Sequence, residues 1–396
     1  MKSKPFQHPK SKSPALPIRL LTVVPICDGH DSAINTINLE FIRHGIEVIY
    51  LGYHRSARDI VRAAIQEDVR AIGISSYNGG HVEFFAKVIA LLKKNHAGDI
   101  GVFGGGGGTI TPADAGEMEN KGVDRIFFAG TPLAEMVQFV KKAYGRRRAE
   151  DGGRRTEDGV EGGGPMASFR FKSDADIARS LTALEINRRT FSPRRSADGT
   201  RVLGITGPGG AGKTTLIDEI ALRFLKANPR ARLAILSHDP SLVGQGALLG
   251  DRATMIHSQN DRVFMRSLAT RGRAGGLSPA TERCLRLLKR CRFDLVLIET
   301  VGIGQEAMPF GPELVNKTIF VMSPDYGSRL QLQKIVMLDV ATIVVVNKSD
   351  LPGAKTAAAE VEQRLAFNCS GQKLVTTVAK RHGDPGVDKL FGELMS

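Results

Sequence analysis

A glycine-rich stretch carries the residues with the clearest chemistry in this chain. An apolar run at 202–206 leads into a segment that matches the GxxxxGK[ST] pattern of phosphate-binding loops. Glycines let backbone N–H groups turn towards phosphate oxygens, and the helix that follows adds positive potential. Lys213 is expected to reach the outer phosphates and Thr214 to ligate magnesium. The predicted phosphate contacts are Gly207, Gly209, Gly210, Ala211, Gly212, Lys213, Thr214 and Thr215.

A second motif predicts which base the nucleotide carries. Asn347, Lys348 and Asp350 form an NKxD pattern at the end of an apolar run, 342–346. Asp350 can accept hydrogen bonds from N1 and N2 of guanine, a pair of donors that adenine lacks. Ala379, in the loop after the last predicted strand, is expected to contact the same base through its backbone. The pattern therefore favours GTP over ATP.

Carboxylates at strand ends supply the expected metal site. Asp239 and Glu299 each follow an apolar run, and a carboxylate in that position can hold magnesium directly or through water. A helix-capping role is the alternative for Glu299. Gly302 can offer its N–H to the γ-phosphate and respond to its loss. The predicted catalytic group is therefore Lys213, Asp239, Glu299 and Gly302, whereas no spacing requires Gln305 to orient the water.

Three further clusters follow predicted strands in the N-terminal third. They are Asp28-Gly29-His30-Asp31, Ser75-Ser76-Tyr77 and the five-glycine run 104–108. Open α/β sheets bind ligands at the carboxyl ends of their strands. His30 could donate one ring nitrogen to Asp28 and keep the other for a metal, although such a histidine taken alone is more often a solvated loop residue. The glycines suggest close approach of a large flat or phosphate-bearing ligand.

Strict alternation of strands and helices must position these clusters, and it predicts two α/β domains with parallel sheets. The first is a flavodoxin-like domain and the second a P-loop domain. The predicted strands are 20–24, 47–51, 71–74, 100–103, 124–128, 202–206, 233–237, 294–298, 318–322, 342–346 and 374–378. The predicted divisions are a basic tail at 1–18, the first domain at 19–144, a flexible linker at 145–172 and the second domain at 173–396.

A docking helix is expected at the start of the second domain. Ser173 and Asp176 have the spacing of a helix N-cap, and Ile177, Leu181 and Leu184 fall on one face. An apolar face on a short helix must be covered, so we expect it to pack on a neighbouring domain.

Composition restricts the remaining possibilities. The 396 residues carry a formal net charge of +14, but no tryptophan, five tyrosines and no basic segments interleaved with aromatics. We therefore expect neither a nucleic-acid nor a membrane partner, and assign the charge to a solvated surface, linkers and phosphate-bearing ligands. The four cysteines are widely spaced, which favours reduced thiols in the cytoplasm.

The three N-terminal clusters together resemble the cobalamin-binding domain of acyl-CoA mutases, with its DxHxxG, SxL and GG motifs. The resemblance implies that His30 is the lower axial ligand of cobalt, that Asp28 is its hydrogen-bond partner and that Ser75 contacts the displaced base. Ala33 stands where the motif has its final glycine, and Tyr77 where it has leucine. The cobalamin contacts that it implies are Asp28, His30, Ser75, Tyr77, Gly105, Gly107 and Gly108.

The second half resembles the mutase-chaperone GTPases of the MeaB type. The motifs that carry this resemblance are the phosphate loop, NKxD and the segments 239–241, 250–252 and 299–305. The domain order, with segments 75–81 and 265–271, is similar to the family of fused isobutyryl-CoA mutases. The resemblance implies that Asp251 joins Thr214, Asp239 and Glu299 at the magnesium ion, and that 324–334 is a further switch segment.

These features together predict a GTP-hydrolysing, cobalamin-binding module that loads, gates or protects adenosylcobalamin for a mutase acting on isobutyryl-CoA or methylmalonyl-CoA. GTP, Mg²⁺ and adenosylcobalamin are the implied ligands. No acyl-CoA-binding barrel follows the last helix, so we expect a separate substrate-binding mutase subunit as partner, and a homo-oligomer. The alternatives are a non-catalytic cobalamin sensor or corrinoid carrier, and a truncated fused mutase.

Overall fold

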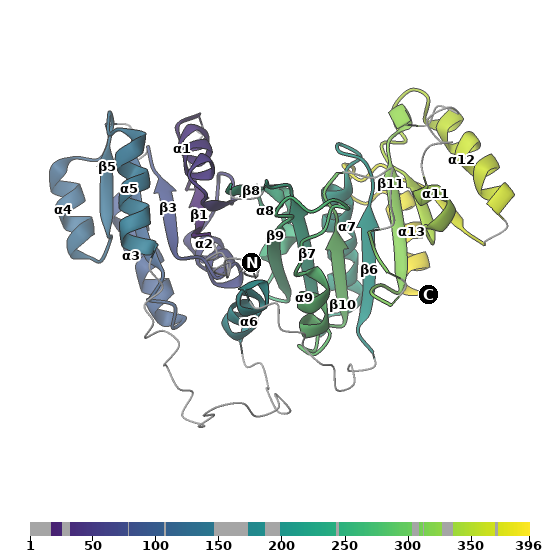
Figure 1. Cartoon of the computed structure of the whole chain (residues 1–396), viewed down its shortest axis with the longest axis horizontal. Helices are drawn as coiled ribbons and strands as arrows, with labels where there is room; N and C mark the ends of the chain where they lie inside the picture. Colours follow the sequence, from purple (N-terminus) through teal and green to yellow (C-terminus); the bar gives the residue numbers. More distant parts are fainter. Residues whose placement is uncertain are drawn as a thin grey trace, which may run out of the picture.

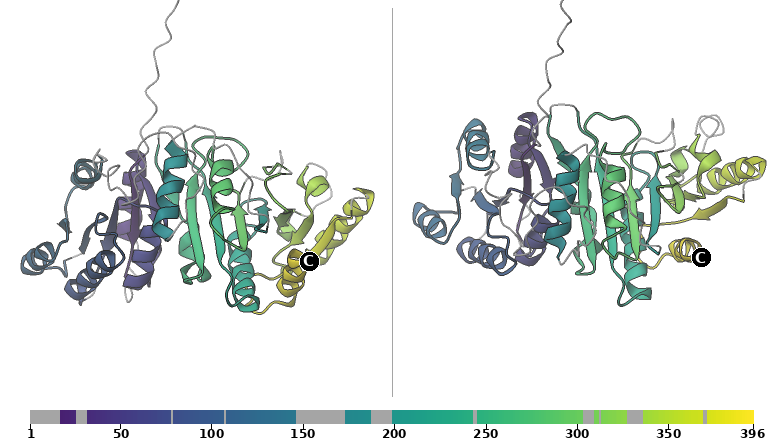
Figure 2. Two further views of the ribbon diagram at one scale, coloured as in Figure 1. Left: turned by 90° about the horizontal axis from the view of Figure 1, so that it is seen from below. Right: turned by 60° about the horizontal axis from the view of Figure 1, so that its bottom comes forward.

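Two parallel sheets, each covered by helices on both faces, lie side by side along the longest axis of the molecule (Figure 1). Two further views show the same arrangement of an N-terminal and a C-terminal half (Figure 2). The computed structural model describes residues 17–25, 32–77, 79–106, 108–145, 173–186, 199–242, 245–302, 309–311, 313–326, 336–368 and 371–396. The α/β class predicted from the sequence is confirmed.

The first sheet has six strands in the order β5-β4-β3-β1-β2-β8, all of them parallel. Its first five strands along the chain are β1 (Arg19–Val23), β2 (Glu47–Tyr50), β3 (Ala71–Ser75), β4 (Gly101–Gly106) and β5 (Arg125–Phe128). The helices of this half are α1 (Ser32–Arg43), α2 (Ala57–Gln66), α3 (His81–Lys94), α4 (Pro112–Asn120) and α5 (Leu133–Tyr144). Strand order 2-1-3-4-5 is flavodoxin-like, and the reversal at β1 and β3 opens a crevice at their carboxyl ends.

The sixth strand of this sheet comes from the other half of the sequence. β8 (Ala247–Leu249) pairs with β2, so that Ala247 faces Glu47 and Leu249 faces Ile49 in the register. The sequence did not predict this strand, because three residues are too short to show a period. The predicted divisions of the chain therefore do not coincide with the sheets.

The second sheet has seven parallel strands in the order β13-β12-β11-β6-β10-β7-β9. They are β6 (Arg201–Thr206), β7 (Leu233–Asp239), β9 (Val263–Ala269), β10 (Leu295–Glu299), β11 (Lys317–Met322), β12 (Ile343–Val346) and β13 (Lys373–Thr376). The helices are α6 (Asp174–Ile186), α7 (Lys213–Ala227), α8 (Asp251–Thr254), α9 (Thr281–Leu288), α11 (Met337–Val340), α12 (Ala354–Asn368) and α13 (Pro385–Met395), with 3-10 turns at His257–Gln259 and Pro324–Tyr326.

All eleven predicted strands are present, with small shifts at their ends. The largest shift is in β4, which continues through the first three residues of the glycine run to Gly106. β9 was not predicted, because Arg266 and Ser267 interrupt its apolar run. Every residue of β9 is nevertheless buried, and Arg266 is among the largest fully buried side chains.

The core explains why the strands are apolar on both faces. In the first half, one cluster lies under α2, α3 and α4, and another lies under α1 and α5. In the second half, α7 and α13 cover one cluster, α6 and α9 a second, and α11 and α12 a third. A parallel sheet with helices on both faces needs strands that are hydrophobic throughout.

Helix α6 lies between the two halves. Ser173 and Asp176 make reciprocal hydrogen bonds at its start, with Ser173 N donating to Asp176 Oδ2 at 3.1 Å and Asp176 N to Ser173 Oγ at 3.3 Å. Ile177 and Leu181 are buried, and the helix contacts α2 of the first half and α9 of the second. The predicted linker lies outside the described residues except for Gly145, as does the tail before residue 17.

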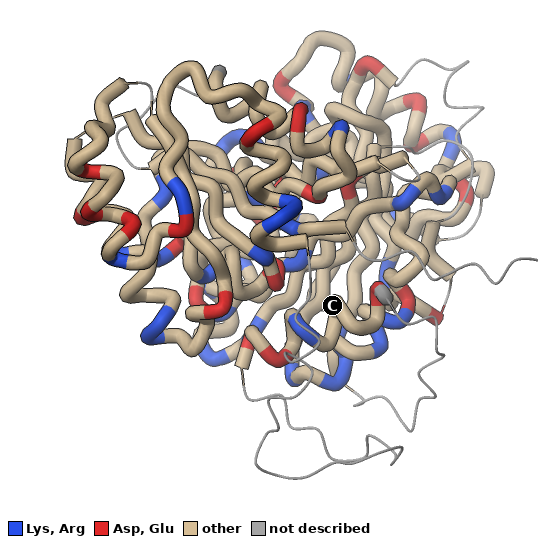
Figure 3. The backbone as a smooth tube through the Cα atoms, turned by 60° about the vertical axis from the view of Figure 1, so that its left-hand side comes forward, with Lys and Arg blue, Asp and Glu red and all other residues tan. Residues whose placement is uncertain are grey.

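Charged positions are distributed over both halves. In the view of Figure 3, acidic and basic positions are interspersed along the backbone.

Within the described residues, none of the helices is both long enough and apolar enough to cross a bilayer.

Candidate functional site

The phosphate-binding loop connects β6 to α7 in the centre of the second sheet. Its glycines occupy conformations that other residues rarely adopt, with φ of 144° at Gly207, 73° at Gly210 and 88° at Gly212. A Cβ on Gly207 would lie 1.9 Å from the carbonyl oxygen of Val321. Strand packing and loop shape therefore both require glycine here.

Lys213 and Thr214 begin helix α7 at the loop. Lys213 is 6% exposed, and its Nζ donates to the carbonyl oxygens of Gly207 at 3.0 Å and Pro208 at 3.1 Å. Burial lowers the pKa of Lys213, and the carboxylates of Glu299 and Asp251 oppose that shift. The ammonium group is thus held against the loop that would surround the phosphates.

Asn347 ties the phosphate loop to the predicted base-reading loops. Its Nδ2 donates to the carbonyl oxygen of Ala211 at 2.9 Å. Its Oδ1 accepts from Thr377 Oγ1 and from the N–H of Ala379, both at 3.0 Å. Asn347 is buried, so its amide joins its own loop to two others, a role that its place in the motif did not reveal.

Asp350 lies at the rim of the same region. Its carboxylate accepts from Lys380 Nζ at 2.6 Å, and this hydrogen bond holds the pKa of Asp350 below its usual value. Lys348 has a φ of 58°, which turns the chain sharply after β12. An ionised carboxylate at this rim is what recognition of the two guanine donors requires.

Three carboxylates gather beside Thr214. Thr214 Oγ1 donates to Glu299 Oε1 at 2.7 Å, and Ser237 Oγ donates to Asp251. Burial, followed by the neighbouring Asp251, raises the pKa of Glu299 to about 8. Burial also raises the pKa of Asp239 well above its usual value, and Asp251 and Glu299 add to that shift. The cluster therefore favours added positive charge.

This cluster fits a magnesium ion with few protein ligands. Asp239 Oδ2 and Glu299 Oε2 are buried oxygens without a hydrogen-bond partner among the described residues. Within the same residues, no three acidic, histidine or cysteine side chains are close enough to hold a metal by themselves. Mg²⁺ typically takes one or two carboxylates and completes its shell with phosphate oxygens and water. Thr214 with one or two of the carboxylates could supply such a site.

Gly302 lies against the phosphate loop. Its carbonyl oxygen accepts from Gly209 N at 3.1 Å, and a Cβ on Gly302 would lie 2.5 Å from Gly209 Cα. A larger residue could not approach so closely, so glycine is needed for this contact. Gln305 and most of the predicted segment 324–334 lie outside the described residues.

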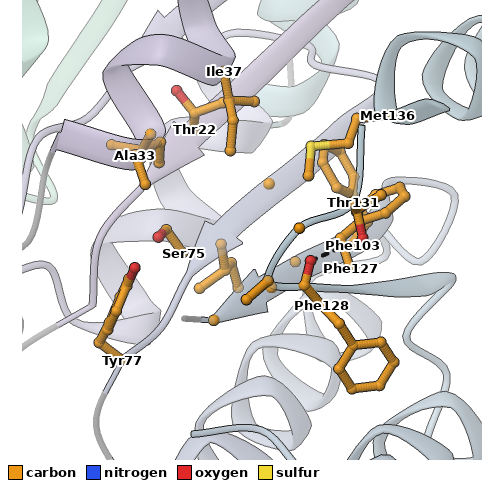
Figure 4. A pocket seen from close by; sticks show the side chains of 18 of the residues that line it. Thr22, Ala33, Ile37, Ser75, Tyr77, Phe103, Phe127, Phe128, Thr131 and Met136 are labelled. Atoms are coloured by element: carbon orange, nitrogen blue, oxygen red, sulfur yellow. Dashed lines mark hydrogen bonds between the residues drawn. The ribbon is translucent and has the colours of Figure 1, made fainter. Parts of the chain in front are cut away.

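The first half has a pocket of about 300 Å³ at the carboxyl ends of its strands (Figure 4). Ser75 and Tyr77 line it together with Ala33 and Ile37 of α1, and aromatic rings form part of its wall. Gly104, Gly105 and Gly106 line it too. The structure thus brings Ser75, Tyr77 and the first glycines of the run to one crevice, large enough for a flat heterocycle.

The same glycines are also required by the packing of β4. A Cβ on Gly104 would lie 2.5 Å from the carbonyl oxygen of Ile74, and one on Gly106 would lie 2.0 Å from that of Ser76. Gly108, with a φ of 95°, has open space around it. From the sequence, the whole glycine run was attributed to a ligand. Packing against the neighbouring backbone accounts for part of the run, at Gly104 and Gly106.

Other predicted ligand residues could not be placed. Asp28, His30 and Gly107 lie outside the described residues, so their roles stay predictions. One polar group was missed: Thr22 lines the pocket, and its Oγ1 is buried without a partner in the described part of the chain. A threonine inside an apolar strand gives no signal in the sequence.

Two family models match the chain. The B12 binding domain matches residues 18–137, and the methylmalonyl-CoA mutase-associated GTPase MeaB matches residues 183–393. The first match contains the 300 Å³ pocket, and the second contains the phosphate loop, the carboxylates and the NKxD motif.

Longer relatives match both halves at once. The chain is 37% identical to the fused isobutyryl-CoA mutase of Cupriavidus metallidurans and 36% identical to that of Geobacillus kaustophilus. These matches cover 97% and 96% of the chain but 36% of each relative, so the chain spans about a third of their length. A crystal structure of a LAO/AO transport system kinase aligns at 20% identity and a TM-score of 0.39. The alignment covers 57% of this chain and 66% of the kinase chain.

Proposed function

The chain belongs to the family of MeaB methylmalonyl-CoA mutase-associated GTPases and carries a B12-binding domain, and from this premise we propose that it hydrolyses GTP to control the adenosylcobalamin of an acyl-CoA mutase. Control here means loading, gating or protecting the cofactor. The partner in this proposal is a substrate-binding mutase chain of the isobutyryl-CoA or methylmalonyl-CoA type.

One observation carries the link between the two ligands. A cavity of about 1010 Å³ is lined by both halves of the molecule. Gly209 and Gly302 line it from the nucleotide side, and Leu39 and Ile42 of α1 line it from the other. Helix α1 begins two residues after His30 in the sequence, so this cavity joins the nucleotide side to the helix that follows the proposed cobalt ligand.

The nucleotide chemistry assigns a task to each residue. Main-chain N–H groups of Gly207 and 209–215 and the Lys213 ammonium neutralise phosphate charge, which is most of the catalysis in this reaction class. Thr214, Asp239, Asp251 and Glu299 are the candidates for holding Mg²⁺, which when bound supplies charge neutralisation between the phosphates. Gly302, whose carbonyl oxygen accepts from Gly209 N, can offer its own N–H to the γ-phosphate, so that loss of this phosphate would release the segment.

Fewer of the residues proposed to bind cobalamin lie in the described part of the chain. The pocket beside Ser75 and Tyr77 supports binding of the displaced base, and its wall is aromatic and apolar. His30, with Asp28 behind it, is our proposed lower ligand of cobalt. Cobalamin bound in this way supplies the radical chemistry of a mutase, while this chain holds and orients it. Buried free thiols at Cys284 and Cys291 agree with the reducing cytoplasm that we propose as its location.

The test pairs a nucleotide variant with a cobalamin variant in the full chain. We expect Lys213→Ala to lower kcat for GTP hydrolysis by about 100-fold or more, since a transition-state charge partner is lost. Adenosylcobalamin binding, followed by its visible spectrum, should remain that of the parent. An unchanged turnover in Lys213→Ala would refute its catalytic role.

His30→Ala is the reciprocal control. It should hydrolyse GTP like the parent but bind cobalamin without the spectrum of imidazole-ligated cobalt. A parent chain that binds both ligands without measurable Mg²⁺-dependent phosphate release would instead be the cobalamin sensor or carrier. Pull-down of a mutase chain with a non-hydrolysable GTP analogue then tests the partner.

A further inference from the structure

Buried charged side chains join the two halves of the molecule. Glu67 follows α2 of the first half, and Arg252 belongs to α8 of the second; both are fully buried. Their side chains pair, with Arg252 Nε donating to Glu67 Oε1 at 3.1 Å. The same network contains Arg19, Glu47, Glu185, Arg266 and Arg271.

The Glu67 carboxylate is surrounded by donors. Besides Arg252, it accepts from Arg19 Nη2 at 2.8 Å and from Ser267 N at 3.0 Å and Ser267 Oγ at 3.0 Å. Arg19 lies on β1, and Ser267 lies on β9 of the other sheet. A buried carboxylate with this many donors can occupy only one position, because each alternative would leave a buried donor unpaired.

Arg252 is held just as closely. Its Nη2 donates to Gln66 Oε1 at 3.2 Å and to the carbonyl oxygen of Met265 at 2.6 Å. Gln66, like Glu67, stands at the end of α2. The guanidinium is thus bound mainly by the cobalamin-binding half, although Arg252 belongs to the GTPase half.

The residue before Arg252 is Asp251, one of the carboxylates beside the phosphate loop. Helix α8 has only four residues, and Gly250 provides no side-chain cap, so the helix has little stability of its own. It is anchored on one side by Arg252 and on the other by β8, which is a strand of the first sheet. Ser237 of β7 also donates to Asp251, so both halves set the position of Asp251, and the cobalamin-binding half does so through Arg252 and β8.

We propose that Glu67 is a positioning residue for the nucleotide site: by holding Arg252, it places the Asp251 carboxylate where magnesium and Thr214 need it. The inference rests on the proposed GTPase function. It goes further in assigning part of the magnesium site to a residue of the B12-binding domain, which touches neither nucleotide nor metal.

The test measures Mg²⁺ affinity separately from turnover. Equilibrium binding of a fluorescent non-hydrolysable GTP analogue is titrated with Mg²⁺ for the parent and for Glu67→Gln, which keeps the size of the side chain but loses its charge. We expect the apparent Mg²⁺ affinity of Glu67→Gln to fall by about 10–100-fold, as for other residues that orient metal ligands. The adenosylcobalamin affinity should stay unchanged.

Glu185→Gln is the matched control. Glu185 is a carboxylate of the same network with 2% exposure, paired to Arg266 at 2.6 Å, but it does not contact Arg252. It should lose similar stability while keeping the Mg²⁺ affinity of the parent. An equal loss of Mg²⁺ affinity in both variants, or none in Glu67→Gln, would overturn the proposal.

A second variant keeps the proposal testable if Glu67→Gln does not fold. Arg252→Lys retains the charge but cannot reach all three acceptors, and we expect it to weaken Mg²⁺ affinity in the same direction; an unchanged affinity contradicts the proposal. Where Glu67→Gln does fold, the two changes should be non-additive in a double-mutant cycle, because they break one interaction. A parent chain that binds no Mg²⁺–nucleotide would instead disprove the proposed function itself.

Discussion

The buried carboxyl groups at the nucleotide site favour the binding of a cation. Glu299 and Asp239 are buried carboxyl groups whose pKa values lie above the usual range, because burial and neighbouring carboxylates disfavour the anion. Such groups are costly in a purely structural role. A bound divalent cation reverses the balance, since it favours the ionised carboxylates.

Asp350 allows a test of base selectivity at the same scale. Asp350→Asn removes a charged acceptor for guanine N1 and N2, and each charged hydrogen bond contributes about 1.5–3 kcal/mol. We therefore expect GTP to bind at least about 10-fold more weakly. Xanthosine triphosphate, with a carbonyl in place of the 2-amino group, should bind more tightly to the variant than to the parent. Competition binding measures both.

Lys380→Gln is the control for this substitution. It removes the exposed partner of Asp350 and leaves the carboxylate in place. Exposed ion pairs contribute little, so the preference for GTP should persist. Equal selectivity of the parent and Asp350→Asn would show that the carboxylate does not read the base.

Elements rather than single residues decide the shape of the proposed cobalamin pocket. β4 runs close to its neighbour β3 because glycines replace side chains at its end. The reversal of strand order at β1 and β3 opens the crevice there, and α1 forms its other side. The pocket thus results from the topology together with the glycine content of one strand.

Gly106→Ala tests this view of β4. A Cβ would lie 2.0 Å from the carbonyl oxygen of Ser76, so β3 and β4 must move apart. We expect a loss of about 1–3 kcal/mol in the free energy of unfolding and weaker cobalamin binding. Gly116→Ala in α4 is the control, because open space surrounds that position and alanine favours helix. Equal behaviour of the two variants would contradict the packing argument.

A shared strand and a shared helix hold the two halves of the molecule together. β8 completes the sheet of one half with a strand from the other, and α6 packs on both halves. The buried ion pairs at this interface, such as that of Glu67 with Arg252, form only when the halves are together. Separation would expose or orphan these groups, which is unfavourable.

Cooperative unfolding should follow from this connection. We expect hydrogen exchange followed during urea titration to show β3 and β12 unfolding at one midpoint. Magnesium and a GTP analogue at 100 times the dissociation constant should stabilise both strands by about 2.7 kcal/mol, although only one half binds the nucleotide. Separate midpoints, with only β12 responding, would show that the halves are independent.

Local patterns were sufficient for the parts of the chain that depend on neighbours in sequence. Long apolar runs identified eleven strands. The phosphate loop and the NKxD motif predicted a guanine nucleotide, because a loop that surrounds phosphates needs specific residues in consecutive positions. The docking helix could be located for a similar reason, since its cap and its apolar face lie within one segment. The family matches agree with the two ligand classes that these patterns indicated.

Contacts between distant segments could be found only in the folded chain. β8 is three residues long and takes its partner from another sheet, and nothing in Ala247–Leu249 specifies that pairing. Glu67 and Arg252 look like surface residues in the sequence, since charged side chains are rarely buried unless they are paired. The two residues are 185 positions apart in the sequence. Their side chains become buried and paired only when both halves have folded together.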